Sequence, residues 1–264
     1  MSASYHALMA RTMAERGFDH PIWELNDKVS ARELARLAQV RAPRLLQGPC
    51  SLRAMTPPDE PAVIKPVHGC SARGVVPLLP EGDGYYNPRT DEHLTWEQAV
   101  AQALAAKHTE RNQRLIQRGH PDALRPPWLL EAMVRDAVTG GLPADWKAYC
   151  FDGQAYVILH AYRAASGDLR LQWWDREWNP LGDICPHRKY TVDPTLRPPR
   201  DPDAMITAMD SVASLVDSPF IRVDLYEDAD GPVFGEITPV PTGNTLRFVP
   251  EWDRRLGEAW LAAL

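Results

Sequence analysis

The stretch FIRVDLYEDADGPVFGEITPVPTGN, residues 220–244, decides the fold of this chain. Two runs rich in β-branched residues flank Asp230-Gly231, a dipeptide typical of tight turns, and this pattern predicts an antiparallel hairpin. Each predicted strand carries one acid, Asp224 in the first and Glu236 in the second. Because side chains alternate between the faces of a strand, the apolar neighbours of Asp224 face away from it. We therefore expect the two acids on adjacent rungs of one face of a sheet.

Two carboxylates so close together, half removed from water, would repel each other and shift each other's pKa. A divalent cation removes that cost, and oxygen-only ligands suit magnesium, which takes a few carboxylates plus water and substrate phosphates. Arg222 precedes Asp224 by two residues, so it projects to the same face and could hold an anion beside the metal. An exposed hairpin whose acids are merely solvated explains the same pattern, and this alternative stays open.

A second candidate site is VIKPVHGCSARGV, residues 63–75, in which Lys65 ends a predicted strand. The small residues Gly69, Ser71 and Gly74 follow, and they let backbone N–H groups approach an anion. The lysine precedes the glycines and no GK[ST] follows, so this is not a Walker motif. An ordinary turn has the same composition.

A third candidate is WLLEAMV, residues 128–134, a buried strand that contains Glu131. An unpaired buried carboxylate is costly, so this glutamate needs a partner. A strand edge beside Ala132 and Met133 could pair with a purine ring, with Glu131 accepting from an exocyclic amine. A glutamate that faces water from an edge strand is the alternative.

Composition limits the class of protein. The chain has 264 residues, enough for one large domain or two lobes, and a formal net charge of −6, which argues against nucleic acid as a partner. No apolar run has membrane-spanning length, and the first residues lack a signal-peptide core. Four scattered cysteines without CxxC spacing are expected to be reduced thiols. We expect a cytoplasmic protein that binds neither membrane nor nucleic acid.

The order of predicted elements indicates an α+β protein of two lobes, with a boundary between residues 135 and 143. Ser30 and Glu33 have capping-box spacing at the start of a helix over 30–40. Other stretches predict helices over 96–119 and 201–216, a strand over 61–67, a strand followed by a turn over 169–180, and a hairpin over 146–164 that turns at Asp152-Gly153. The first half is thus expected to be helix-rich, and the second a mainly antiparallel sheet backed by a helix.

These pieces, in this order, resemble the ATP-grasp superfamily and, more closely, its TupA-like branch, named for teichuronopeptide biosynthesis. The matching stretches span residues 26–244 and read NDKVSAREL, AVIKPVHGCSARGV, WLLEAMV, DWKAYCFDGQ, DREWNPLG, FIRVDLYE and FGEITPVPTGN. The resemblance implies an ATP-grasp fold, two α+β lobes with nucleotide bound between them. It implies a short N-terminal extension over 1–25, a small lobe over 26–135 and a C-terminal lobe with the magnesium site over 136–264.

The resemblance also assigns roles to nucleotide-binding residues. Lys28 and Lys65 look like the phosphate-contacting lysines, the loop 68–74 like a lid over the phosphates, and the segment 131–134 like the adenine-binding hinge. Lys147 falls where relatives direct a basic residue at the γ-phosphate. The implied nucleotide-binding set is Lys28, Lys65, His68, Gly69, Ser71, Gly74, Glu131, Ala132, Met133 and Val134.

On the final hairpin, Asp224 and Glu236 match the family's magnesium-binding acids, and Arg222 matches the arginine that steadies the charged intermediate. Many relatives carry an asparagine as a further metal ligand two positions after the second acid. Thr238 stands there in this chain, so the implied metal-binding set is Asp224, Glu236 and Thr238, and the geometry of a second magnesium stays open. The residues before Asn26 are too few for the full N-terminal substrate lobe of D-alanine ligases.

The implied activity is an ATP-dependent carboxylate–amine ligase, which forms an amide through an acyl phosphate and releases ADP and phosphate. Its cofactors would be ATP and Mg²⁺, and its partners a small-molecule carboxylate and an amine. A homodimer is possible because dimers are common among relatives. One alternative is a phosphotransferase acting on a hydroxyl of a small molecule or saccharide. Another is a non-catalytic nucleotide- or carbohydrate-binding module, in which LQWWDREWNP, residues 171–180, stacks on a sugar.

Overall fold

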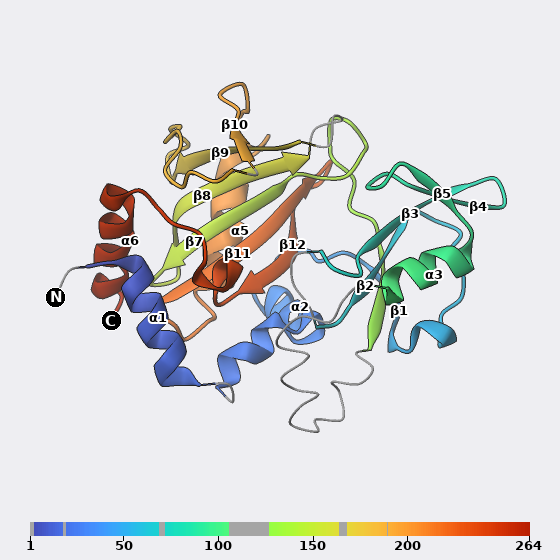
Figure 1. Ribbon diagram of the computed structural model, residues 1–264, viewed down its shortest axis with the longest axis horizontal. Coiled ribbons are helices and arrows are strands. Elements are labelled where there is room, and N and C mark those ends of the chain that lie inside the picture. Colours follow the sequence, from blue (N-terminus) through green and yellow to red (C-terminus); the bar gives the residue numbers. More distant parts are fainter. Residues whose placement is uncertain (1–2, 18–19, 69–71, 106–126, 164–167, 189) are drawn as a thin grey trace. The chain divides into compact units, whose positions relative to one another are not determined.

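The computed structural model describes residues 3–17, 20–68, 72–105, 127–163, 168–188 and 190–264. The chain forms two units: residues 1–26, 30–42 and 136–264 make the larger, and residues 27–29 and 43–135 the smaller. Each unit is built on a mostly antiparallel sheet with helices (Figure 1). The predicted α+β class is confirmed.

The larger unit contains a six-stranded sheet in the order β10-β9-β8-β7-β11-β12. All pairs are antiparallel except β10 with β9. The hairpin predicted over 146–164 turns at Asp152 and Gly153, both with positive φ, as the primed turns require. The strands are β7 (Asp145–Phe151), β8 (Gln154–Arg163), β9 (Leu169–Asp175), β10 (Tyr190–Val192), β11 (Phe220–Asp228) and β12 (Gly231–Thr238).

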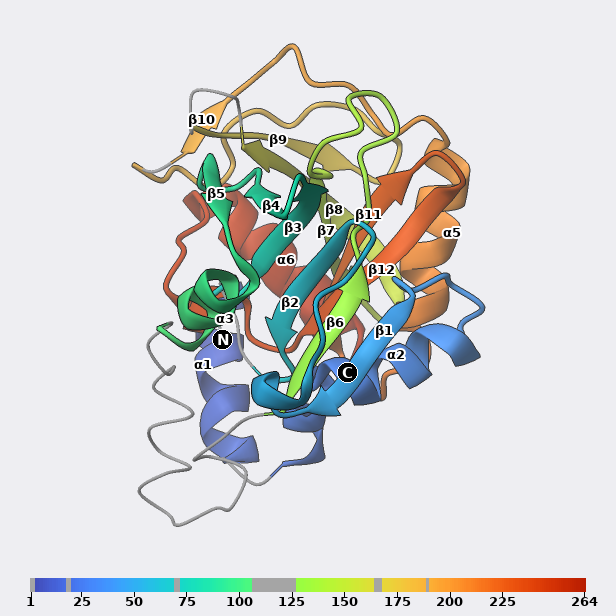
Figure 2. The same ribbon diagram turned by 90° about the vertical axis from the view of Figure 1, so that its right-hand side faces the viewer.

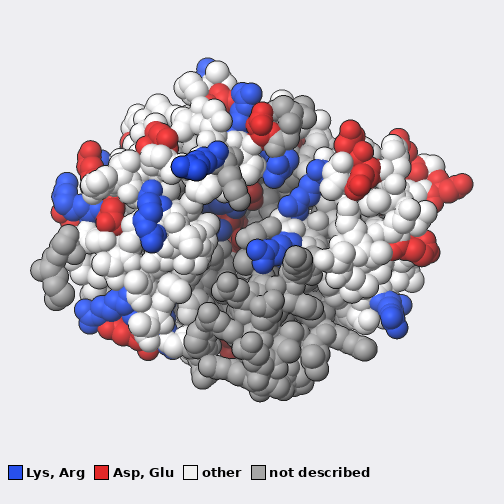
Figure 3. Space-filling model, viewed as in Figure 1, with Lys and Arg blue, Asp and Glu red and all other residues white. Residues whose placement is uncertain are grey.

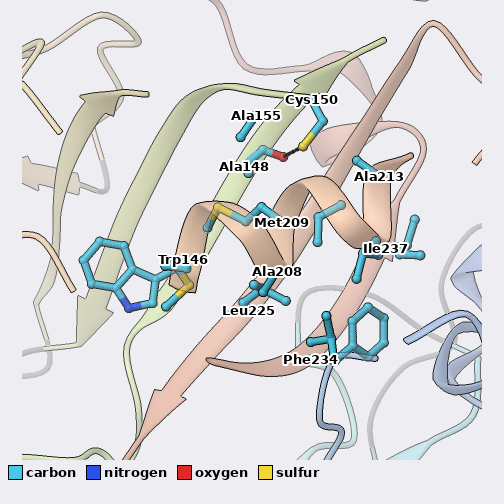
Figure 4. Packing of buried hydrophobic residues seen from close by; sticks show 14 of the residues in the cluster. Trp146, Ala148, Cys150, Ala155, Ala208, Met209, Ala213, Leu225, Phe234 and Ile237 are labelled. Atoms are coloured by element: carbon cyan, nitrogen blue, oxygen red, sulfur yellow. Dashed lines mark hydrogen bonds between the residues drawn. The ribbon is translucent and has the colours of Figure 1, made fainter. Parts of the chain in front are cut away.

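One face of this sheet is covered by α5 (Pro202–Ala213), which begins after Asp201, whose side chain accepts a hydrogen bond from the Ala204 N–H. The predicted helical face of α5 is buried, and Met209 packs against strand residues such as Trp146 (Figure 4). The alternating apolar residues of β7 and β11 supply the other side of this core. Polar side chains of these strands are therefore left for the opposite face.

The opposite face is closed at one end by α1 (Tyr5–Arg16) and α6 (Pro250–Ala262), which lie side by side (Figure 1). Tyr5 fits among aromatic rings, with its centroid 5.3 Å from Phe220, and Phe220 stacks on Trp260 at 5.1 Å. Gly257 lets the two helices approach, because a Cβ there would clash with the Ala3 carbonyl. Residues 5–16, assigned to an N-terminal extension in the sequence, thus form part of the larger unit's core.

The helix expected over 30–40 runs instead over Lys28–Leu37 as α2, preceded by a 3₁₀ helix, η1 (Pro21–Asn26). Asp27 rather than Ser30 caps it, since the Asp27 carboxylate accepts a hydrogen bond from the Val29 N–H. Ala31 and Ala35 of α2 are buried in the same hydrophobic core as α5. Residues 30–42 therefore belong to the larger unit, although the sequence placed them in the small lobe.

The smaller unit contains a second six-stranded sheet, all antiparallel, in the order β1-β6-β2-β3-β4-β5 (Figure 2). The expectation of a helix-rich first half was wrong, because Gly and Pro interrupt the alternation that identifies strands such as β1. The strands are β1 (Leu45–Cys50), β2 (Ala62–Pro66), β3 (Val76–Glu81), β4 (Gly84–Asn87), β5 (Glu92–Leu94) and β6 (Trp128–Ala132).

The helix predicted over 96–119 is present as α3 (Trp96–Leu104), with a capping box formed by Thr95 and Gln98. Its predicted continuation over 106–119 lies outside the described residues. Acidic side chains gather over the β4–β5 side of the smaller unit (Figure 3), namely the exposed Glu81, Asp83, Asp91 and Glu92. Such a surface repels a phosphate backbone, in keeping with the net charge.

Short 3₁₀ helices connect several elements, among them η2 (Leu52–Ala54) and η4 (Pro241–Asn244). No helix within the described ranges combines the length and the apolar character that a membrane crossing requires.

Candidate active site

The final hairpin places its two acids directly opposite each other, on one rung rather than on adjacent rungs. Asp224 of β11 pairs with Glu236 of β12, and with Lys147 of β7 on its other side. Two residues along the strand, beyond the pair of Val223 and Ile237, Arg222 pairs with Thr238. Since these positions alternate with residues buried beneath α5, the charged side chains share the opposite face.

A β-bulge holds this rung in place. The pairing shifts after Asp224 and Glu236, so that Leu225 pairs with Phe234 and Gly235 is the extra residue. A Cβ at Gly235 would lie 2.9 Å from the carbonyl oxygen of Asp224, closer than any side chain tolerates. The glycine at this position is therefore required by the close approach of the two backbones.

Both carboxylate oxygens of Asp224 are bound by cationic side chains. Arg222 donates from Nε to Oδ1 and from Nη2 to Oδ2, each at 2.6 Å, and Lys147 Nζ lies 2.7 Å from Oδ2. Asp224 is only 2% exposed and Arg222 8% exposed. A buried carboxylate with charge-assisted bonds to two cations is well compensated.

Each cation also has a partner other than Asp224. Lys147 Nζ lies 3.2 Å from Asp145 Oδ1, and Arg222 Nη2 donates to Thr238 Oγ1 at 2.9 Å. Arg222 Nη2 also lies 3.5 Å from Glu236 Oε1, and the Glu236 side chain is 36% exposed. Glu236 is thus the accessible acid of the rung, and Asp224 the buried one.

These contacts shift the pKa values of the buried groups. Burial alone would lower the pKa of Lys147, but the carboxylates of Asp145 and Asp224 outweigh it and raise that pKa. The pKa of Arg222 is raised in the same way, chiefly by Asp224 acting against burial. Burial would raise the pKa of Asp224, yet Arg222 and Lys147 lower it. All three groups are therefore charged at neutral pH.

The donor set of this rung fits magnesium. Asp224 and Glu236 offer hard carboxylate oxygens from facing positions. Within the described ranges, no group of three or more His, Cys, Asp or Glu side chains is arranged to hold a metal. The protein would thus contribute two carboxylates and leave the other positions to water and phosphate oxygens, which is the arrangement that Mg²⁺ favours.

In the smaller unit, Lys65 of β2 contacts the carboxylate of Glu131 on the neighbouring strand β6. The side chains are 13% and 3% exposed, respectively. β6 is an interior strand between β1 and β2, so the expectation of an edge strand was wrong. The N–H groups of Ala132 and Met133 donate to the carbonyls of Arg44 and Pro61, at 2.8 and 2.9 Å.

The other predicted nucleotide-binding residues lie in the same unit. The Lys28 N–H donates to the Val67 carbonyl at 3.1 Å, which joins the start of α2 to the loop after β2. In that loop, His68 Nδ1 lies 3.3 Å from Asp27 Oδ2. Gly74 has φ of +73° and packs against the ring of Trp128, whereas Gly69 and Ser71 lie outside the described residues. Lys65 thus lies in the sheet, His68 and Gly74 follow in the loop, and Lys28 at the start of α2 is bonded to that loop.

Sequence reasoning missed Asp27 and Asp145. Asp145 precedes Lys147 by two residues within DWK, and strand alternation alone would have placed both side chains on one face. Asp27 carried the usual signal of a helix cap.

Comparisons with known proteins complete the description. A family model described as TupA-like ATPgrasp matches residues 8–261. No curated protein matches the sequence.

Solved structures with a similar chain path include the Bacillus anthracis D-alanine–D-alanine ligase complexed with ATP, 13% identical with a TM-score of 0.48, over 90% of this chain and 65% of that one. The ATP-grasp ligase PsnB complexed with minimal precursor, Mg and ADP is 15% identical, with a TM-score of 0.44, over 98% and 66% of the two chains. The D-cycloserine synthetase DcsG is 17% identical, with a TM-score of 0.45, over 97% and 76%. This chain spans 58–67% of the length of the D-alanine–D-alanine ligases.

Proposed function

The chain belongs to the TupA-like ATP-grasp family, and from this premise we propose that it is an ATP-dependent carboxylate–amine ligase. ATP-grasp ligases use ATP and Mg²⁺. We use the name charged rung for Asp224, Glu236 and Lys147, which share a rung, together with Arg222, two residues away on the same face. The charged rung is the observation that supports the proposal most strongly, since its two acids fit Mg²⁺ and its cations fit phosphate. ATP is an intracellular metabolite, so a cytoplasmic location follows as part of the proposal.

In the larger unit, Asp224 and Glu236 would hold the metal ion. Bound there, Mg²⁺ would neutralise charge on the β- and γ-phosphates of ATP. Lys147 would hold the γ-phosphate from the same rung. Arg222, fixed by its bonds to Asp224 and Thr238, would stabilise the oxyanion that forms at the acyl carbon.

In the smaller unit, Lys65 would contact the α- and β-phosphates, and Glu131 would hold the lysine side chain in place. Lys28 would add a second phosphate contact, and the loop 68–74 would cover the phosphates. The segment 131–134 would carry the adenine. Because the N–H groups of Ala132 and Met133 are engaged within the sheet, adenine contacts fall to the remaining backbone groups of that segment.

The proposed reaction has two steps. A carboxylate oxygen of the substrate attacks the γ-phosphorus of ATP, the bond to ADP breaks, and an acyl phosphate forms. An amine then attacks the acyl carbon, the bond to phosphate breaks, and an amide remains after loss of a proton. The chain positions reactants and neutralises charge, so no side-chain nucleophile is required.

Transfer of the phosphoryl group to a hydroxyl would use the same charged rung and is the second candidate. Product analysis separates the two. A ligase releases phosphate only when both a carboxylate and an amine are present, and mass analysis finds the amide. A phosphotransferase retains the phosphoryl group on the product and needs no amine.

The decisive variant is Glu236→Gln, which removes one metal-binding charge at a partly exposed position. We expect turnover to disappear while the thermal unfolding midpoint changes little. Asp230→Asn is the matched control, because Asp230 is 85% exposed at the tip of the same hairpin. The assay measures phosphate release with ATP and Mg²⁺ across a panel of carboxylates and amines. Near-normal ATP consumption by the Glu236 variant would contradict the metal assignment.

A further inference from the structure

Lys147 binds Asp224 and one other carboxylate, and Arg222 binds Asp224, the Thr238 hydroxyl and, at 3.5 Å, the Glu236 carboxylate. Lys147 is shared between Asp224, at 2.7 Å, and Asp145, at 3.2 Å. Arg222 is shared between Asp224, at 2.6 Å, and Thr238, at 2.9 Å. Within the described residues, neither Asp145 nor Thr238 forms a hydrogen bond or an ion pair with the Asp224 carboxylate. The sharing is therefore a property of the cations.

Asp224 has two proposed partners that compete for its carboxylate, namely the cationic side chains and the metal ion. Its Oδ2 accepts from both Lys147 and Arg222, and its Oδ1 accepts from Arg222. Both acceptor positions of Oδ2 are thus used, and a metal ion that coordinates Oδ2 has to displace one of these contacts. A displaced cation without a second acceptor would lose its charge-assisted bond and regain side-chain freedom.

We propose that Asp145 and Thr238 are positioning residues that hold Lys147 and Arg222 at the site once a metal ion takes Asp224. This inference rests on the proposed function, because it uses the metal site of that reaction. The reserve partner of each cation is built into the sheet: Asp145 lies two residues before Lys147 on the same strand face, and Thr238 is the cross-strand neighbour of Arg222. The cations thus stay on the rung in both states and remain available for phosphate.

The proposal gives Thr238 a role different from that of a metal ligand. Its hydroxyl oxygen already accepts the Arg222 hydrogen bond. It also gives the partly exposed Asp145 a role, which is to hold Lys147 at the site. Both residues act through a cation and touch neither substrate nor metal.

A double-mutant cycle on Asp145 and Lys147 tests the idea. The probe is Mn²⁺ alone, which takes the same oxygen ligands as Mg²⁺, with free Mn²⁺ measured by electron paramagnetic resonance. Lys147→Met should tighten Mn²⁺ binding by about tenfold to hundredfold, because one charge-assisted bond no longer competes for Asp224. Asp145→Asn should weaken binding by about tenfold in the native background, because Lys147 then depends on Asp224 alone.

In the Lys147→Met background, Asp145→Asn should change the Mn²⁺ affinity by less than about twofold, since no lysine remains to be released. An equal weakening in both backgrounds would overturn the proposal, because Asp145 would then act on the ion directly. Arg170→Met is the matched control, since it breaks an ion pair with Asp193 in the same unit, at 3.1 Å. It should leave Mn²⁺ binding unchanged.

Thr238 supplies a second test that keeps the lysine intact. Thr238→Val should weaken Mn²⁺ binding. Thr238→Ser should bind Mn²⁺ as tightly as the native protein, since serine keeps the hydroxyl acceptor. In an Arg222→Met background, the valine substitution should have no effect. A persistent effect there would identify Thr238 as a metal ligand and overturn its positioning role.

One further variant separates failure of this inference from failure of the proposed function. Asp224→Asn should abolish the Mn²⁺ binding seen in the Lys147→Met protein. If Mn²⁺ binds without dependence on Asp224, or binds no variant, the metal site itself is wrong and both proposals fail. If binding depends on Asp224 but the cycle shows no coupling between Asp145 and Lys147, only the positioning roles fail.

Discussion

Gly235 lies against the carbonyl oxygen of Asp224 at the bulge of the final hairpin, with no room for a side chain between them. The glycine therefore controls the register that sets Asp224 opposite Glu236. The requirement for glycine is steric. The atom nearest to an added Cβ belongs to the backbone of Asp224, and a backbone atom cannot rotate away as a side chain can.

Gly235→Ala should lower the free energy of unfolding by about 1–3 kcal/mol, the usual cost of overpacking a tight site. It should also weaken metal binding, because the rung has to shift. Gly141→Ala is the control: its Cβ would lie 3.4 Å from the Thr139 hydroxyl oxygen, an ordinary contact. Denaturant titrations of the two variants measure the difference, and equal stabilities would contradict the steric argument.

The buried pair of Lys65 and Glu131 gives a second prediction. Glu131→Gln keeps the shape but leaves Lys65 without its counter-charge, and it should destabilise the protein by about 3 kcal/mol. It should also weaken ATP binding, since the lysine loses its fixed position.

The control for that variant is Glu60→Gln, which breaks the exposed pair with Arg44 in the same unit. A surface pair contributes less than about 1 kcal/mol, so this control should remain close to the native protein in stability and ATP affinity. Calorimetric ATP titration and thermal unfolding supply both readouts. Normal ATP affinity in the Glu131 variant would show that Lys65 needs no anchor.

The burial of His160 predicts that the stability of the protein depends on pH. Its ring stacks on Trp146 at 3.8 Å, its Nδ1 has no hydrogen-bond partner in the described protein, and burial lowers its pKa to about 4. In the unfolded chain the pKa is about 6.5, so between these values the unfolded state binds more protons than the folded state. Stability should therefore fall as the pH drops from about 6.5 to about 4, by up to about 3 kcal/mol from this residue.

His160→Phe preserves the stacking and removes the titration, so the slope of stability against pH in that window should flatten. Urea unfolding of both proteins at a series of pH values measures it. An unchanged slope would assign the effect to other groups.

The cysteines offer a simple chemical test. Cys50, Cys150 and Cys185 are free thiols, and burial raises the pKa of Cys185 to about 11 and that of Cys150 further. Since the thiolate is the reactive form, neither buried thiol should react with iodoacetamide at pH 8 in the folded protein. Mass analysis of labelled peptides should show both modified only after denaturation. Rapid labelling of Cys150 in the native state would show that the core beneath α5 opens.

Local patterns in the sequence predicted the parts of the fold that depend on near neighbours. The Asp152-Gly153 dipeptide set the turn of the first hairpin, and the spacing of Met205 and Met209 set the buried face of α5. The final hairpin was also predicted, but it turns one residue earlier than Asp230-Gly231, at Ala229 and Asp230. These features need only alternation, helical spacing and turn chemistry. The shared rung of Asp224 and Glu236 was not predicted, because it depends on the bulge at Gly235.

Other features depend on contacts between distant segments, which no local pattern encodes. The pairing of Lys65 with Glu131 requires β2 and β6 to be neighbours, although much of the smaller unit lies between them in sequence. The edge position assigned to Glu131 failed for the same reason. The strand β1 was missed because a Gly-Pro pair interrupts it, and α1 because its apolar face is narrow and becomes informative only beside α6.

The packing of Tyr5 against Trp260 has a consequence for biosynthesis. A ribosome exposes the first helix early, yet the rings that enclose it come mainly from strands and a helix made much later. All strands of the smaller sheet, by contrast, have been translated once residue 132 is added. The smaller unit can therefore fold first during synthesis. Tyr5 stays exposed, and accessible to chaperones, until α6 has left the exit tunnel.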